Sequence, residues 1–158
     1  MRCRCFDNLL GALFSDSEEM KLRIEAITDR GIPNSERLHL RVVEATNLMS
    51  HVILVSAYVG ETQIANGALS SFWLPPIDVA PGDQVILYSR AGTYVPPPPS
   101  LPGFRTFFFY WGNPQTLWNT PSACAMVLDL ASWQTSPNAI NQLATGNAFT
   151  QLKRPFPT

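Results

Sequence analysis

The sequence has little charge, few cysteines and no long hydrophobic run. Charged residues make up 15% of its 158 residues, against about 25% in an average soluble protein. A soluble domain with so few charges is expected to have much of its surface covered by other protein, for example by copies of itself. Because the chain contains no run of roughly 18 or more apolar residues, we predict no membrane span and no membrane partner.

The chain has three cysteines, Cys3, Cys5 and Cys124. Three is too few for a disulfide framework in a chain of this length, and an odd number cannot all be paired within it. This usage predicts a reducing, intracellular setting. Cys3 and Cys5 lie beside two arginines, which would favour thiolate and hence a redox or metal-binding pair. An isolated Cys-x-Cys lacks the second ligand pair of a zinc site, so we favour two free thiols. Cys124 lies within an apolar strand pattern and is predicted to be a small buried side chain.

The charges almost balance, with a formal net charge of −1 and a sequence pI of about 6.1. A broad nucleic-acid-binding surface needs a basic face, so nucleic acid is not the expected partner. At the N-terminus, Arg2 and Arg4 precede a short apolar piece that Asp7 interrupts. We infer no signal peptide there, because the longer apolar region and the small-residue cleavage site are missing.

The chain is predicted to divide into an N-terminal extension (1–19), a β-domain (20–133) and an extended C-terminal tail (134–158). Apolar residues recur at helical spacing in the extension and predict a short amphipathic helix that packs on the domain or on a neighbouring subunit. The tail is polar and lacks a core of its own, so we expect it to be ordered only against a neighbour. The stripe of the extension consists of Phe6, Leu9, Leu10, Leu13 and Phe14.

Short alternating stretches of apolar and polar residues, separated by turn residues, predict an all-β domain. No helix-length pattern lies between them, which argues against a parallel βαβ sheet. We therefore predict an immunoglobulin-like antiparallel β-sandwich. The predicted strands cover residues 20–27, 36–44, 51–57, 70–74, 83–89, 104–112 and 123–130.

Ala80-Pro81-Gly82-Asp83 joins two of these stretches and predicts a type II turn. Pro81 presets φ for the first central position, and Gly82 accepts the positive φ that the second central position needs. Asp78 and Asp83 flank this turn and could bind calcium only if more oxygens converged. Turn capping is the reading that we favour for both.

The stretch 104–112 carries aromatic residues on both faces, with Phe107, Phe109 and Trp111 on one and Phe108 and Tyr110 on the other. One face of a sandwich can bury only half of them. A partner, a loop or the N-terminal extension must cover the rest, unless the strand is central and buried on both sides. We therefore predict partner contacts at two residues of this strand, and also at apolar residues of the termini and of the loop that follows the strand. The residues are Phe6, Leu10, Phe14, Phe108, Tyr110, Trp118 and Phe156.

Four consecutive prolines, Pro96 to Pro99, lie in the long connection 91–103. Such a run favours polyproline II and cannot donate to a β-ladder. It could serve as a docking peptide for an aromatic groove. We favour a stiff spacer at the end of a hairpin.

No residue set in the chain indicates a reaction, and we expect no catalytic residue, no cofactor and no metal. His39 and His51 could approach each other if their strands pair, but no third ligand follows at metal spacing. Arg23, Arg37 and Arg41 could share one sheet face near Phe108 and form a small patch for an anionic ligand. The alternative, which we favour, is a solvated face with ion pairs to Glu25 and Glu44.

Residues 20–133 resemble the lamin-tail domain, which occurs in nuclear lamins and in many bacterial proteins. The resemblance rests on the order and spacing of several short motifs. They are the alternating strand that Glu36 opens, Phe72-Trp73-Leu74-Pro75, residues 80–88, Phe-Phe-Tyr-Trp-Gly at 108–112, Leu117-Trp118-Asn119 and the strand 123–129. The resemblance implies an immunoglobulin-like sandwich that mediates protein contacts and has no catalytic residues.

These observations favour a non-enzymatic structural or interaction module that packs against neighbouring protein subunits in an assembly. Low charge, surplus aromatics on one strand and two termini without a core support this prediction. A phage or viral coat-associated protein of the decoration or cement type would suit the pattern, in the bacterial cytoplasm or the virion. The alternative is a nucleic-acid or acidic-ligand binding module that uses the arginine and aromatic face.

Overall fold

The computed structural model describes residues 20–98 and 103–136, and this part of the chain is all-β, with a single 3-10 turn, η1, at Leu48–Ser50. The predicted helix over 1–19, with Phe6, Leu10 and Phe14, lies outside the described residues, as does Phe156. The strands are β1 (Leu22–Thr28), β2 (Arg37–Val42), β3 (Thr46–Asn47), β4 (His51–Ala57), β5 (Ser70–Trp73), β6 (Asp78–Val79), β7 (Gln84–Tyr88), β8 (Thr106–Tyr110) and β9 (Ala123–Asp129).

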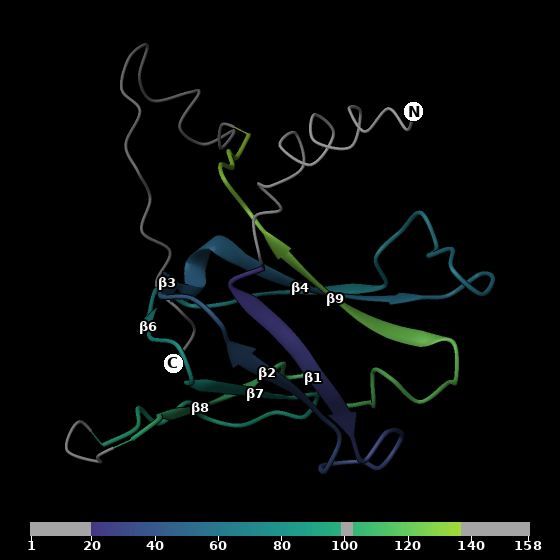
Figure 1. Ribbon diagram of the computed structural model, residues 1–158. Helices are drawn as coiled ribbons and strands as arrows, with labels where there is room; N and C mark the ends of the chain where they lie inside the picture. Colours follow the sequence, from purple (N-terminus) through teal and green to yellow (C-terminus); the bar gives the residue numbers. More distant parts are fainter. Residues whose placement is uncertain (1–19, 99–102, 137–158) are drawn as a thin grey trace, which may run out of the picture.

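The strands form two main sheets and one small one (Figure 1). The larger sheet has the order β1-β2-β7-β8, and the smaller has the order β5-β4-β9. The short strands β3 and β6 pair with each other. All seven predicted strands are present, each within a few residues of its expected bounds, so the all-β prediction is confirmed.

The two main sheets share one hydrophobic core. Alternation along each strand puts every second side chain on the core side, as Leu38 and Leu40 of β2 and Ile53 and Val55 of β4 illustrate. These four side chains are at most 1% exposed. Facing sheets that bury their inner side chains together provide most of the hydrophobic stabilisation of such a domain.

The alternation of β1 is interrupted within the strand. Strict alternation would put residues 22, 24 and 26 on one face, but the pairing with β2 has a register shift between Ile24 and Ala26. Ile27 therefore packs against the core in place of Ala26, which is exposed. A β-bulge inserts an extra residue, and the side chains beyond it change face.

The expected all-antiparallel arrangement is also wrong at one pair, because β7 and β8 run parallel. A hairpin cannot join parallel strands, so residues 89–105 form a crossover and not the spacer at the end of a hairpin that the prolines predicted. The crossover returns beside β8, where Gly92 faces the Tyr110 ring and the Tyr94 ring stacks on Phe109 at 5.0 Å. Among the described residues, 92–98 make no backbone hydrogen bonds to β8.

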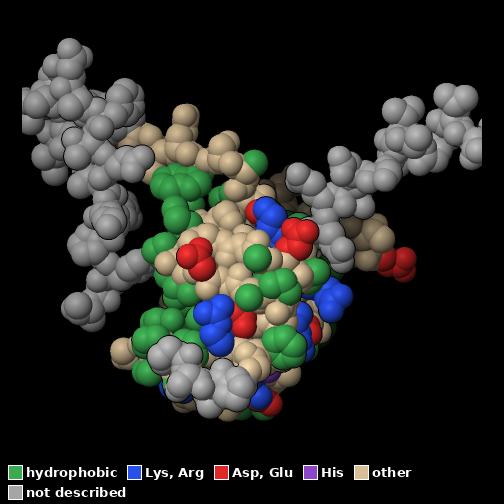
Figure 2. Space-filling model, turned by 60° about the vertical axis from the view of Figure 1, so that its left-hand side comes forward, with side chains coloured by type: hydrophobic (Ala, Val, Ile, Leu, Met, Phe, Trp, Pro, Cys, Tyr) green, Lys and Arg blue, Asp and Glu red, His purple; other side chains and the backbone are tan. Residues whose placement is uncertain are grey.

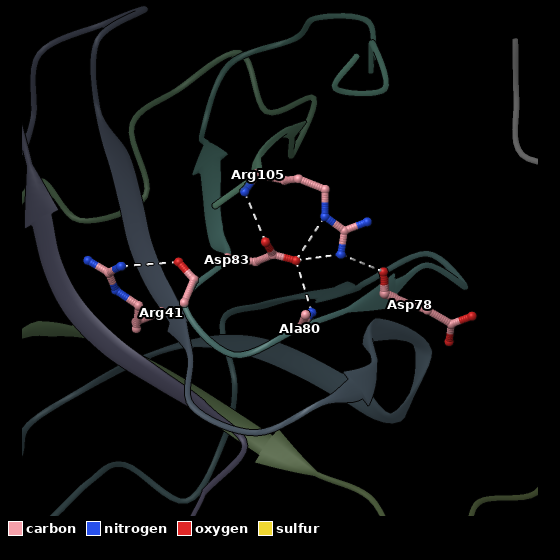
Figure 3. A network of polar contacts seen from close by, with 6 residues as sticks. Arg41, Asp78, Ala80, Asp83 and Arg105 are labelled. Carbon is pink, nitrogen blue, oxygen red and sulfur yellow. Dashed lines mark hydrogen bonds and ion pairs between the residues drawn. The ribbon is translucent and has the colours of Figure 1, made fainter. Parts of the chain in front are cut away.

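Asp83 fixes the start of β8 beside the start of β7 (Figure 3). Its carboxylate accepts hydrogen bonds from the backbone N–H and the guanidinium of Arg105 and from the N–H of Ala80. Burial alone would raise the pKa of Asp83, but these hydrogen bonds outweigh it and lower the pKa. The predicted capping role of Asp83 is therefore confirmed, and Arg105 is positioned by the same group.

The predicted type II turn is confirmed. Asp83 N–H donates to the Ala80 carbonyl at 3.0 Å, and Gly82 has a φ of 92°. Only glycine adopts this φ readily.

Candidate interaction surfaces

The outer face of the sheet β5-β4-β9 carries no charged residue. The core-facing residues of β4 are His51, Ile53 and Val55, so its alternate residues point away from the core. Strand pairing puts the matching residues of β5 and β9 beside them. The outward positions are Val52, Leu54 and Ser56 on β4, Ser71 and Trp73 on β5, and Cys124, Met126 and Leu128 on β9. We call this set the apolar face.

Side chains of the apolar face do not belong to the core. Val52, Leu54, Met126 and Leu128 are partly exposed, and none of them packs against the core cluster. Water therefore reaches apolar side chains on all three strands, because these four lie on β4 and β9 and the exposed Trp73 lies on β5. Two positions differ. Ser56 is 1% exposed, and its Oγ donates to the Gly67 carbonyl at 3.4 Å. Cys124 is 7% exposed, and the prediction that it is a buried small residue is confirmed.

An exposed aromatic pair lies at one end of the apolar face. The Trp73 and Trp133 rings meet edge to face, with their centroids 4.7 Å apart. Trp73 is 43% exposed and Trp133 is 50% exposed. Because Trp133 follows β9 along the chain, the polypeptide passes from β9 toward β5 at this end of the sheet before it continues to residue 137.

The start of the described chain lies at the same end. Lys21 Nζ is 3.7 Å from Asp129 Oδ2, which places the beginning of β1 beside the end of β9. Lys21 and Trp133, which are near the two ends of the described chain, therefore both lie at the Trp73–Asp129 end of the apolar face.

The outer face of the larger sheet is different, because its charged side chains are paired. Arg37 pairs with Asp29, and Arg41 pairs with Glu25 at 3.0 Å. Figure 2, which brings the left-hand side of Figure 1 forward, shows Lys and Arg side chains next to Asp and Glu side chains on that side of the molecule as well. Arg23 lies opposite Arg41 across the β1–β2 pair. The three arginines of the predicted anionic-ligand patch do share one sheet, and the expected ion pair of Arg41 with Glu25 is present.

Aromatic side chains continue this face onto β7 and β8. Tyr88 and Tyr110 are cross-strand neighbours with stacked rings 5.5 Å apart. Phe108 is 40% exposed, whereas Phe107 and Phe109 are buried on the core side, as the alternation predicts. Phe108 and Tyr110 are thus accessible as partner contacts, and that role remains a prediction.

Trp118 was predicted to contact a partner, and this prediction is wrong for the described domain. Its side chain is 0% exposed, and its ring meets Trp111 edge to face at 5.9 Å. The backbone N–H of Trp118 donates to Glu36 Oε2 at 3.1 Å. This hydrogen bond holds the loop against the core, so the largest aromatic side chain of the loop points inward.

The two histidines lie in different sheets and do not form a site together. His51 is fully buried, and burial lowers its pKa despite Asp129, whose carboxylate lies 3.7 Å away. The pKa of His39 is also lowered, mainly by burial. Over residues 20–98 and 103–136, no three His, Cys, Asp or Glu side chains gather as metal ligands. Within the same ranges, no helix has the length and apolar character to cross a membrane.

In comparisons with known proteins, the chain matches no family model and no curated sequence. The resemblance to the lamin-tail domain therefore remains a prediction from its motifs.

Proposed function

We propose that the protein is a non-enzymatic structural module that packs against further copies of itself through the apolar face. The observation that carries this proposal is the absence of charge from all eight outward positions of β5-β4-β9, in a sheet whose other side fills the core. Exposed apolar patches of this kind mark protein contact sites. We propose further that the fold is a lamin-tail-like immunoglobulin sandwich. The resemblance to that family implies a domain that mediates protein contacts, which agrees with the proposed role.

A second copy suits the apolar face for an electrostatic reason. In a two-fold contact, the same patch lies opposite itself, so a charge near the axis meets its own copy and a charge elsewhere needs an opposite charge on the same patch. The apolar face has no charge to repel its own copy. Its flat, aliphatic surface can pack face to face at the spacing of about 10 Å that stacked sheets adopt.

The size of the face implies that other segments contribute to the contact. The strands β4 and β9 are about 23 Å long and β5 is about 13 Å long, so at a spacing of about 4.8 Å the face has a projected area of about 280 Å². A stable interface needs about 800 Å² from each partner. The exposed Trp73–Trp133 pair adds to one end. The apolar stripe predicted in residues 1–19 would supply more. A coat-associated role in a phage or virus is consistent with such a contact.

Self-association of the full chain tests the proposal. Leu54→Glu and Met126→Glu each place a charge in the middle of the apolar face, where the second copy offers no positive charge to pair with it, and we expect either one to weaken association at least tenfold. Light scattering after size-exclusion chromatography measures the mass, and circular dichroism checks the fold. Thr106→Glu, on the outer face of the larger sheet, is the matched control and should associate like wild type. A wild-type chain that stays monomeric at high concentration would rule the proposal out.

A further inference from the structure

Arg90 lies over two aromatic rings of the larger sheet, whereas Arg37 lies over only one of them, with its guanidinium carbon 5.8 Å from the centre of the Tyr88 ring. The guanidinium carbon of Arg90 lies 5.1 Å from the centre of the Tyr88 ring and 5.2 Å from the centre of the Tyr110 ring. The two rings are themselves nearly parallel, with an interplanar angle of 15°. Contact with two aromatic rings stabilises the cation and restricts the conformations of the long side chain.

The charge of Arg90 is not neutralised by a neighbouring acid. Arg37, Arg41 and Arg105 each form an ion pair with an aspartate or glutamate. In the described part of the chain, no such pair forms at Arg90, and its buried Nε has no hydrogen-bond partner. Its one hydrogen bond, from Nη1 to the Ala91 carbonyl, is long at 3.4 Å. The guanidinium is therefore an oriented donor with most of its hydrogen bonds unmade.

Arg90 also lines a small cavity. The cavity has a volume of about 240 Å³, which is below the roughly 300 Å³ of the smallest usual small-molecule sites. It suits one functional group of a partner better than a cofactor. Its other polar side chains, which can donate or accept hydrogen bonds, are Asn34, Ser89, Asn113, Gln115 and Thr116.

Hydrogen bonds around Glu36 hold the walls of this cavity in place. The buried Glu36 carboxylate accepts hydrogen bonds from the N–H groups of Gly31, Leu117 and Trp118. Its carbonyl accepts from Ser89 N–H at 3.1 Å, and Gly112 N–H donates to the Arg90 carbonyl. The turn before β2, the end of β7 and the loop after β8 are thereby joined, so the cavity is formed before any ligand binds.

We propose that Arg90 and this cavity bind a single carboxylate group of a peptide, from an acidic side chain or from a chain terminus. A carboxylate offers two oxygens to the planar fork of a guanidinium, and such bidentate pairs are the strong form of this hydrogen bond. The amide and hydroxyl side chains of the cavity can bind the peptide groups on either side of the carboxylate. The site lies on the larger sheet and does not depend on the apolar face.

The charge count favours a carboxylate over a phosphate. A phosphate monoester carries about −1.5 to −2 charges at neutral pH and is usually bound by several cations. Arg90 is the only lysine or arginine among the residues that line the cavity. One guanidinium balances one carboxylate, whereas a dianion would keep a net negative charge there.

Titration of the full chain with three N-acetylated peptides tests the proposal. The first has one glutamate and an amidated C-terminus, the second has glutamine in its place and a free C-terminal carboxylate, and the third has glutamine and an amidated C-terminus. Nitrogen-15 NMR follows the Arg90 Nε–H signal. We expect a saturable shift of this signal with the first peptide, the second or both. A shift with the first identifies an acidic side chain as the source of the carboxylate, and a shift with the second identifies a chain terminus. The third peptide should cause none.

Variants show whether the effect comes from the guanidinium. Arg90→Gln should weaken binding about tenfold or more, and Arg90→Lys should too, because it keeps the charge but loses the fork. Arg23→Gln, which removes the same charge from β1 outside the cavity, should bind like wild type. Met126→Glu should also bind like wild type, which separates this test from the test of self-association. Three results would overturn the proposal: no binding of either carboxylate peptide, equal binding by Arg90→Gln, or tighter binding of inorganic phosphate than of both peptides.

Discussion

A single buried carboxylate connects distant parts of this domain. Glu36 is 0% exposed, and its carboxylate accepts hydrogen bonds from Gly31, which precedes it, and from Leu117 and Trp118, which follow more than 80 positions later in the chain. The loop that carries Trp118 is held by these bonds, and the tryptophan ring is buried as a result. The alternating strand that Glu36 opens was recognisable in the sequence, but the acceptor role of its carboxylate was not. Its hydrogen-bond partners are backbone groups, which leave no pattern in the sequence.

His51 gives the domain a predictable pH dependence. Burial lowers its pKa in the folded state, although Asp129 and nearby backbone carbonyls oppose this and Lys21 adds to it slightly. The unfolded chain, with a histidine pKa of about 6.5, therefore binds more protons at mildly acidic pH than the folded one. The stabilisation from neutral His51 is complete above about pH 6.5 and is lost as the pH falls through the lower folded-state pKa.

Urea unfolding at several pH values checks this expectation. The free energy of unfolding should decrease between about pH 7 and pH 5 in wild type, and less so in His51→Gln. His39→Gln serves for comparison, because the pKa of His39 is lowered as well. The double variant should show the smallest slope. If wild type and the double variant have the same slope over this interval, histidine burial does not set the pH dependence.

At the scale of the elements, the alternation of apolar and polar residues predicted the positions of the strands. It did not predict their register or direction, because these depend on which strands pair. The strand 51–57 was predicted with its observed bounds, because its β-branched and apolar residues are continuous. The bulge in β1 follows from its register against β2, and residues 22–28 alone carry no signal of it. The parallel pairing of β7 and β8 depends on Asp83 and Arg105, which are 22 residues apart and meet only in the folded chain.

The sequence also predicted only part of the candidate interaction surfaces. It pointed to Phe108 and Tyr110 correctly as outward residues of one strand. Nothing in the sequence indicated the apolar face. Such a face forms only when three strands pair, and along each strand its outward residues alternate with residues of the core. Arg90 was missed for a similar reason, since the two tyrosines that hold it come from different strands.

The turn before β7 allows a test at the level of one element. Gly82 has a left-handed φ of 92°, and a Cβ there would lie 2.2 Å from the Phe104 ring. We expect Gly82→Ala to lower the free energy of unfolding by about 1–2 kcal/mol, mainly through backbone strain. Urea denaturation measures this change. Gly60→Ala is the matched control, because a Cβ there meets no atom within 4 Å. Equal losses in the two variants would show that the turn does not require a glycine.

For the whole molecule, the two sheets differ in what they present to the outside. The larger sheet has paired charges, stacked tyrosines and the Arg90 cavity. The smaller sheet has a face without charge, and Lys21 and the Trp73–Trp133 pair lie at one end of it. This asymmetry fits a module that packs on neighbouring copies with one side and leaves the other side available for a different ligand.

Intermolecular contacts of the apolar face can be observed directly by NMR. In a mixed sample of isotope-labelled and unlabelled full-length chains, magnetisation transfer between copies can be selected. The account predicts transfer from the methyl groups of Leu54, Met126 and Leu128 to protons of an unlabelled copy, and none from Ile86 on the other sheet. Transfer that is absent at these three methyl groups, in a sample where the chain has associated, would contradict the central claim that this face joins the copies.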